Sequence, residues 1–453
     1  MQKNYDQFKK IIIMAMSIAI FGLVILAFAY VWYTDYNYNL MTGDKFFNRK
    51  GNWLIIALYG LMQLFFTKIY GGFKVGYYKI SNIIYSQMLS ITLVNALIYF
   101  VISLVGRELV DLTPIFKLTF IDAFIIVAWT YVVSKIYEQL FPPRKLLVIY
   151  SNHNATTLIR KMCQRSDKYQ ICEAISIDEG LEQIKHRIDE YDGAIICDAP
   201  GKIRNDILKY CFETSKRTYI TPKISDVIIR GADELNLFDT PILLCRNRGL
   251  SMEQRLVKRF FDITLSLIAL VVLSPILLII AIAIKLYDHG PVFFTQERVT
   301  IDGKKFKIYK FRSMIVDAEK DGHSIPATDN DPRITPVGKI IRKTRFDEFP
   351  QLINIIKGDM SIVGPRPERV EHVEEYAKEM PEFRYRTKVK AGLTGYAQIY
   401  GKYNTTAYDK LKLDMMYIEN YSLRLDFQLI IMTVKVLFMK ESTEGFDDDE
   451  QNK

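Results

Sequence analysis

The sequence holds few of the residues that build metal centres, disulfides or redox sites. Its 453 residues include only five cysteines and five histidines. The cysteines form no CxxC pair and the histidines no HExxH motif, so we assign neither type as metal ligands. All five cysteines fall in the middle third, which indicates a reduced, cytosolic domain there.

Acidic residues are fewer than basic residues, and the formal net charge is +9. This excess favours anionic partners, namely phosphates, anionic lipid or nucleic acid. The basic residues are not interleaved with an aromatic stacking platform or a nucleic-acid motif, so we expect no nucleic-acid partner.

Long apolar runs are abundant in the first third of the chain. Four of them are candidate membrane helices, the second being short: Ile11–Trp32, Trp53–Phe66, Ile83–Val105 and Ile115–Val133. The first lacks a cleavage signature of small residues, so we expect an anchor and not a signal peptide. Basic residues before the first run and after the fourth place both ends in the cytoplasm. Residues 1–141 are therefore predicted to be a four-helix membrane domain, and no intramembrane charge pattern indicates transport.

Residues 142–250 alternate strand-like and helical patterns, which predicts a small parallel, Rossmann-like α/β domain. A dinucleotide site would need a glycine-rich first turn, because side chains there block the approach of the pyrophosphate. The turn after the first strand has no glycine. We expect a regulatory or scaffolding role, with a degenerate nucleotide site as the alternative. The predicted strands are Lys145–Tyr150, Ile171–Ile177, Gly193–Cys197, Thr218–Ile220 and Pro241–Cys245.

One further apolar run, Phe260–Leu286, is interrupted by Ser274 and Pro275. Proline removes a backbone donor and clashes with the preceding turn, so the helix should kink there. We predict a re-entrant helix that enters and leaves the same leaflet, with Ser274 helping to satisfy the freed backbone. The alternative is a plain fifth transmembrane helix. This run lies in a mixed α/β, membrane-associated domain predicted over residues 251–440.

The most informative stretch reads TRFDEFPQLINIIKGDMSIVGPR, over residues 344–366. Its adjacent carboxylates, Asp347 and Glu348, precede Pro350, which fits the first turn of a helix, and Gly358, which fits its end. The pair is thus expected at a helix N-terminus, where the dipole favours anions. Carboxylates, nearby cations and a helix N-terminus suit a phosphate and metal site, whereas the alternative is an acidic helix cap among surface charges.

Several motifs occur in a fixed order along the chain and make the interpretation of this stretch more specific. They are Lys258-Arg-Phe-Phe-Asp262, Gln296-Glu-Arg298, Lys310-Phe-Arg-Ser-Met314, Asp347-Glu348 and Gly364-Pro-Arg-Pro367. Together they resemble the bacterial sugar transferase family, the polyprenyl-phosphate hexose-1-phosphate transferases. The N-terminal part, with its four predicted membrane helices and Rossmann-like domain, resembles the long-form members of this family, of the undecaprenyl-phosphate glucose or galactose phosphotransferase type. Ser313 departs from the usual threonine, and Thr300 and Ile301 stand in a turn where glycine is usual.

The resemblance implies a mechanism. Asp347 would attack the β-phosphorus of a UDP-sugar and expel UMP. Undecaprenyl phosphate would then take the sugar-1-phosphate and so initiate capsule or exopolysaccharide synthesis. Glu348, with Asp347, would hold Mg²⁺. UDP-glucose is the first choice of donor and UDP-galactose the second.

Basic residues around the pair are candidates to bind phosphate, because guanidinium and ammonium groups match its oxygens. The alternative for each is a surface salt bridge. Two of them, Lys258 and Arg259, would meet the lipid phosphate or headgroups. The full set is Lys258, Arg259, Lys310, Arg312, Arg333, Arg345 and Arg366.

The resemblance also places the catalytic domain on the cytoplasmic face of the bacterial inner membrane. Leu423–Lys440 could lie on the membrane surface or face the core. Residues 394–414 are expected to vary with the sugar, residues 441–453 form an acidic tail predicted to be disordered, and a homo-oligomer is possible.

Two other classes of protein stay open. A non-catalytic membrane regulator would leave the carboxylate pair without a role. A membrane nucleotide-sugar dehydratase needs a glycine-rich loop with Tyr-x-x-x-Lys. Tyr408 and Lys412 have that spacing, but so do Tyr131 and Lys135 in a membrane run.

Overall fold

The structure is a computed structural model that describes residues 3–37, 49–151, 155–245, 249–316, 318, 331–401 and 405–437. It divides into two compact units, Met1–Thr221 and Pro222–Lys453. The acidic tail and positions 402–404 of the 394–414 segment lie outside the described residues.

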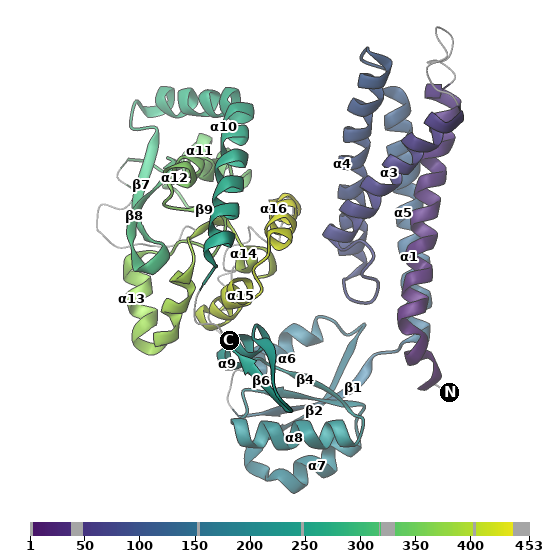
Figure 1. The fold of residues 1–453 in the computed structure, drawn as a ribbon, viewed down its shortest axis with the longest axis vertical. Coiled ribbons are helices and arrows are strands. Elements are labelled where there is room, and N and C mark those ends of the chain that lie inside the picture. The colour runs from purple at the N-terminus through teal and green to yellow at the C-terminus, as the bar shows by residue number, and fades with distance from the viewer. Residues whose placement is uncertain are drawn as a thin grey trace. The chain divides into compact units, whose positions relative to one another are not determined.

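The first unit begins with long helices. They are α1 (Lys3–Val31), which continues as the π-helix η1 (Trp32–Tyr36), α3 (Arg49–Tyr70), α4 (Ile80–Gly106) and α5 (Thr113–Leu140). Each is long and apolar enough to cross a membrane, including α3, whose predicted run was short. They lie side by side (Figure 1), with α1 packed on α3 and α5, and α4 packed on the same two helices.

The outer surface of this bundle is apolar. Leu26, Leu54, Phe120 and Phe124 are each more than 60% exposed. A soluble protein rarely shows apolar patches of this extent, whereas lipid-facing helices do. The sequence prediction of membrane helices is consistent with this surface.

The rest of the first unit is a parallel sheet in the order β2-β1-β3-β4. Helices α7 and α8 cover one face and α6 covers the other. Because both faces are covered, the central strands read as continuous apolar runs rather than as an alternation. The elements are β1 (Arg144–Tyr150), α6 (Ala155–Cys163), β2 (Tyr169–Ser176), η2 (Ile177–Glu179), α7 (Leu181–Asp189), β3 (Gly193–Cys197), α8 (Gly201–Glu213) and β4 (Arg217–Ile220).

The fifth predicted strand, Pro241–Cys245, does not join this sheet. It forms β6 (Thr240–Leu244), which pairs antiparallel with β5 (Asp233–Leu237). The two residues between them form the turn, and Phe238 adopts a left-handed φ of 56°. A local hairpin needs only two connecting residues, whereas a parallel partner needs a long crossover. The hairpin and the preceding α9 (Ile224–Arg230) belong to the second unit.

The second unit combines α10 (Met252–Asp288) with a hairpin, a short parallel pair and smaller helices. Strands β7 and β8 are antiparallel, with Asp302 and Gly303 at positive φ in the connection. The remaining elements are β7 (Phe293–Val299), η3 (Ile301–Gly303), β8 (Lys305–Phe311), α11 (Pro336–Lys343), η4 (Phe346–Glu348), α12 (Gln351–Lys357), β9 (Ser361–Val363), α13 (Val370–Glu379), η5 (Pro381–Lys388), β10 (Gly392–Thr394), α14 (Tyr396–Tyr400), α15 (Ala407–Glu419) and α16 (Leu423–Leu437).

Helix α10 contains Pro275 and bends sharply within its length (Figure 1). Proline has no N–H to donate to the carbonyl four residues earlier, which is that of Val271. The Ser274 hydroxyl donates to this carbonyl over 2.8 Å. Ser274 therefore supplies the hydrogen bond that Pro275 cannot make. The helix bends there, and the Val271 carbonyl still has a donor.

Helix α16 settles the question left open for Leu423–Lys440 within its described part. It buries Asp426, Leu429, Met432 and Lys435 against the second unit. The helix is therefore core-facing on one side and not simply a helix laid on a membrane surface.

Candidate active site

The carboxylate pair follows directly from α11. Thr335 caps this helix by accepting from the Gly338 N–H over 2.9 Å. The chain then turns through Arg345, which has a left-handed φ of 58°. Asp347 and Glu348 lie in the single 3₁₀ turn η4.

The pair was expected at a helix N-terminus, and it lies in the 3₁₀ turn η4 directly before α12. Pro350 is the N-cap of α12, so η4 and α12 are separate elements. Gly358 ends α12 with a φ of 99°, as predicted. Arg345, with its left-handed φ, separates η4 from α11. This change in the chain direction orients the side chains of Asp347 and Glu348.

Glu348 is held by two cations from distant segments. Lys310 Nζ, on β8, lies 2.9 Å from its Oε1, and the Arg366 guanidinium lies 3.0 Å from the same oxygen. Burial alone would raise the pKa of Glu348, but the charges of Lys310, Arg366 and Arg345 outweigh it and hold the pKa well below its usual range. Glu348 is thus an ionised, fixed carboxylate.

Asp347 has a different environment. Its Oδ1 is buried and accepts no hydrogen bond from the described residues. Burial and the charge of Glu348 raise the pKa of Asp347, whereas Lys310 and Arg345 oppose the rise. Adjacent carboxylates therefore differ in role, because one is tied to cations and the other has an oxygen left for a ligand.

A buried arginine, Arg386, holds the backbone at Arg366 by a hydrogen bond, and the sequence did not predict this residue as part of the site. Arg386 donates to the Arg366 carbonyl over 3.0 Å. The same guanidinium pairs with Asp414 at 2.8 Å and with Glu368 at 3.4 Å. Burial, only partly opposed by Arg386, raises the pKa of Asp414 to about 6.

Arg298 is a second residue near the site that was not predicted to act there. Its guanidinium donates to Gln296 Oε1 over 2.6 Å and to the Pro367 carbonyl over 3.4 Å. Burial, with the charges of Arg369 and Arg366, lowers its pKa to about 10. The Gln-Glu-Arg motif was the available sequence signal, and it places this arginine beside the Pro-Arg-Pro loop.

Two of the predicted phosphate ligands, one buried and one half-buried, contact other parts of the second unit. Lys258 is 7% exposed and forms an ion pair with Asp426 of α16. Arg259 donates to the carbonyls of Ile355 and Ile356 at the end of α12. Both side chains tie α10 to the rest of the second unit, and neither lies next to the carboxylate pair in these contacts.

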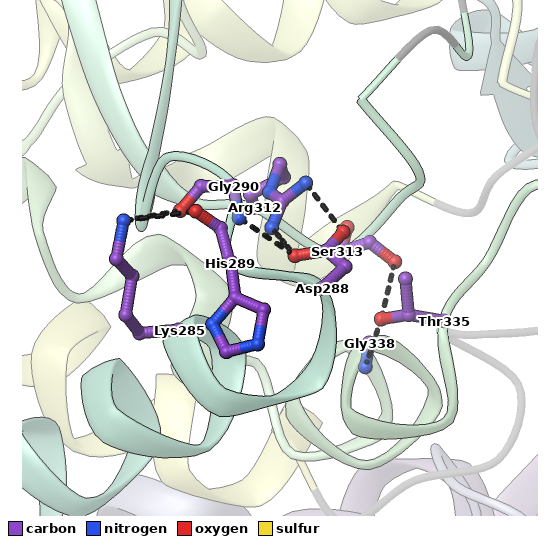
Figure 2. Close-up of polar contacts among 8 residues, drawn as sticks. All are labelled: Lys285, Asp288, His289, Gly290, Arg312, Ser313, Thr335 and Gly338. Carbon is purple, nitrogen blue, oxygen red and sulfur yellow. Dashed lines mark hydrogen bonds and ion pairs between the residues drawn. The ribbon is translucent and has the colours of Figure 1, made fainter.

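Arg312 and Arg333 also have carboxylate partners of their own. Figure 2 shows Arg312 forming a two-pronged ion pair with Asp288 at the end of α10, beside Lys285, His289 and Gly290. Arg333 pairs with Asp331. Of the predicted cations, the structure thus brings Lys310 and Arg366 into contact with Glu348 and places Arg345 near it.

A metal ion would have few protein ligands at this site. The described residues include no cluster of three or more His, Cys, Asp or Glu side chains. Mg²⁺ commonly binds through one or two carboxylates and completes its shell with water and substrate phosphates. The ionised Glu348 and the unpartnered Asp347 Oδ1 fit that type of site.

Comparison with known proteins identifies the class. The family described as "Bacterial sugar transferase" matches residues 253–440, within the second unit. An uncharacterized sugar transferase of Bacillus subtilis, EpsL, is 36% identical over 189 residues, which cover 42% of this chain and 91% of that protein. The chain belongs to the bacterial sugar transferase family.

Longer relatives are also similar to part of this chain. The UDP-glucose:undecaprenyl-phosphate glucose-1-phosphate transferase of Klebsiella pneumoniae is 43% identical, over 47% of this chain and 45% of that protein. The UDP-N-acetylgalactosamine-undecaprenyl-phosphate N-acetylgalactosaminephosphotransferase of Aeromonas hydrophila is 44% identical, over 40% and 43% respectively. The chain spans about half the length of the first curated relatives it matches.

Proposed function

We propose that this chain transfers hexose-1-phosphate from a UDP-sugar to undecaprenyl phosphate, releases UMP and initiates capsule or exopolysaccharide synthesis. The observation that carries the proposal is the contrast between the two adjacent carboxylates. Glu348 is fixed by Lys310 and Arg366, whereas Asp347 has a buried oxygen without a partner among the described residues. This is the arrangement that a carboxylate nucleophile beside a phosphate-binding group requires.

Two displacements at phosphorus make up the reaction. In the first, an Asp347 oxygen bonds to the β-phosphorus of the UDP-sugar and the bond from that phosphorus to the bridging oxygen breaks. UMP leaves with the bridging oxygen, and the sugar phosphate remains on Asp347 as an acyl phosphate, a mixed anhydride. In the second, an oxygen of undecaprenyl phosphate attacks the same phosphorus and the Asp347 carboxylate is released. The products are UMP and a lipid diphosphosugar.

The side chains around the pair have separate tasks in this scheme. Arg366 and Lys310 hold Glu348 and present positive charge where the diphosphate must lie. Arg345 adds positive charge nearby. Glu348, with Asp347, would hold Mg²⁺, whose charge would offset the negative charge of the diphosphate. Asp347 needs no general base, because it reacts in its ionised form.

The same proposal includes the way in which the chain is attached to the membrane. The first unit would anchor the chain in the bacterial inner membrane with both ends of the bundle in the cytoplasm. The bent α10 would be re-entrant and keep the second unit at the cytoplasmic face, where the lipid phosphate lies. The bend at Pro275 and the apolar exposed residues Leu267, Val271, Val272 and Ile279 support this placement.

Glucose is the first choice of sugar and galactose the second. Relatives of this chain are named for glucose, for galactose and for N-acetylgalactosamine, so the last of these belongs in the test as a third donor. The dehydratase alternative receives no support, since Lys412 is paired with Asp409 at 2.7 Å. The regulatory alternative gives the Asp347–Glu348 pair no role.

The test uses the full chain in membranes with undecaprenyl phosphate and each radiolabelled UDP-sugar, with and without Mg²⁺. We expect label in the lipid fraction and release of UMP without UDP. The Asp347→Asn variant should lose both, and an Asp302→Asn control in the exposed β7–β8 connection should keep both. Release of UDP in place of UMP would overturn the reaction, and lack of transfer from all three donors would overturn the proposed donors.

A further inference from the structure

Asp122 is an acidic residue inside the helical bundle, and the proposed transferase makes no use of it. It lies in α5 and its side chain is completely buried. Neither of its carboxylate oxygens accepts a hydrogen bond of standard geometry from any described residue. An ionisable side chain in a membrane-spanning helix is costly and therefore calls for a functional explanation.

The neutral donors nearest to Asp122 are shared with other acceptors. Tyr59 of α3 and Asn95 of α4 lie beside its carboxylate. The Tyr59 hydroxyl donates to Asn95 Oδ1 over 3.0 Å, and Asn95 Nδ2 donates to Thr119 Oγ1 over 2.9 Å. Thr119 donates in turn to the Ile115 carbonyl over 2.8 Å. The single hydroxyl hydrogens of Tyr59 and Thr119 are donated within this chain of bonds, so the second amide hydrogen of Asn95 is the neutral donor left beside the two carboxylate oxygens.

Other polar atoms inside the bundle also lack partners among the described residues. Further buried oxygens without a partner among the described residues are Gln63 Oε1, Gln87 Oε1 and Thr130 Oγ1, while Trp129 Nε1 is a donor without one. No lysine or arginine is among the buried residues of the described helices α1 to α5. An uncompensated carboxylate in such an interior would cost several kcal/mol, on the order of the effective penalty for burying one ion.

A cation is the ligand that this arrangement fits. Oxygen ligands from carboxylate, amide and hydroxyl groups suit hard ions. One carboxylate balances a single positive charge, whereas a divalent ion would leave a net charge in the apolar bundle. We propose that the bundle binds a monovalent metal cation at Asp122, with oxygens of Tyr59, Asn95 and Thr119 completing the site. The bundle would then be a ligand-binding element and not only an anchor.

The experiment measures thermal unfolding of the purified full chain in lipid nanodiscs. NaCl, LiCl and KCl are titrated separately against N-methylglucamine chloride at constant ionic strength and neutral pH. A bound ion should raise the unfolding midpoint by roughly 2–4 °C for each tenfold rise above the dissociation constant. The nearly isosteric Asp122→Asn variant should lose this dependence. The Asp35→Asn control should keep it, because Asp35 forms an exposed pair with Lys117.

Three results would overturn the site. The wild type could show the same midpoint in alkali and N-methylglucamine salts, or Asp122→Asn could respond as the wild type does. A midpoint that depends on pH but not on the alkali ion would mean that a proton neutralises Asp122 instead. Calorimetric titration of wild type with NaCl decides the matter even if the variant does not fold, and it is independent of transferase activity.

Discussion

Arg386 and Arg366 are joined by one hydrogen bond, in which the Arg386 guanidinium donates to the Arg366 carbonyl over 3.0 Å. The side chain of Arg366 contacts Glu348, and Arg386 is itself paired with the buried Asp414. A chain of contacts thus runs from α15 to the carboxylate pair. Arg386 is a positioning residue for Arg366 in this account.

The first prediction concerns this contact. Arg386→Lys keeps a charge near Asp414 but loses the planar group that reaches both Asp414 and the Arg366 carbonyl. We expect turnover to fall by about tenfold to a hundredfold, since small displacements of positioning groups have effects of that size. The readout is kcat and KM from UMP release, compared with the thermal unfolding midpoint.

The control for Arg386 is Arg384→Lys, an exposed residue two positions away. A purely structural role would lower the unfolding midpoint without changing the kcat of the folded fraction. Wild-type kcat in folded Arg386→Lys would contradict the positioning role.

The second prediction concerns the acid limb of the pH profile. In the proposed mechanism Asp347 reacts ionised, so activity should fall as pH drops through its raised pKa. Glu348→Gln removes a negative charge that raises this pKa, and the limb should move to lower pH. Lys310→Met removes a positive charge that lowers it, and the limb should move to higher pH. The pH dependence of kcat/KM for UMP release measures both shifts.

Lys307→Met is the control for these two variants, because Lys307 is an exposed neighbour on the same strand. Its profile should match that of the wild type. Shifts of the two variants in the same direction would show that Asp347 does not control this limb.

Sequence reasoning succeeded where the cause is local. The helix end at Gly358 depends on residues next to it in the chain, and it is present. The first four strands of the α/β domain also follow from local apolar runs. The Ser274 hydroxyl at the Pro275 bend belongs to the same group, because its partner lies three residues away.

The rest depends on which distant segments meet. Lys258 reads as an interfacial cation in the sequence, but Asp426, 168 residues later, neutralises it in the interior. Asp122 reads as one tolerated charge in an apolar run, and only the packed bundle shows that its oxygens are enclosed. Periodicity indicates that a face is buried but not which partner covers it.

The third prediction distinguishes two alternative roles of Lys258, the buried ion pair with Asp426 and the binding of the lipid phosphate. Lys258→Met leaves Asp426 buried without its cation and should destabilise the second unit by about 3–5 kcal/mol. The double variant Lys258→Met/Asp426→Leu should recover much of that loss. Denaturant unfolding measures both, with Lys285→Met, an exposed lysine of the same helix, as control. A higher KM for undecaprenyl phosphate without loss of stability would instead support the lipid-phosphate role.

The fourth prediction concerns Gly338 in α11, whose cap is shown in Figure 2. A Cβ at Gly338 would lie 1.9 Å from the Ser313 carbonyl oxygen. The backbone must move to accept it, so Gly338→Ala should destabilise the second unit by about 1–3 kcal/mol or more. Gly303→Ala is the control, since its Cβ would meet open space and only its φ of 73° is unfavourable. Equal unfolding midpoints for the two variants would contradict this packing.

The most direct test of the central claim is intact-mass spectrometry of the full chain after incubation with UDP-sugar and Mg²⁺ in the absence of undecaprenyl phosphate. The account predicts an added mass of one hexose phosphate on the wild type, mapped to Asp347, which disappears when undecaprenyl phosphate is added. Asp347→Asn should gain no mass. An active wild type that never carries the adduct, or an Asp347→Asn variant that transfers the sugar at the wild-type rate, would contradict a covalent intermediate at Asp347.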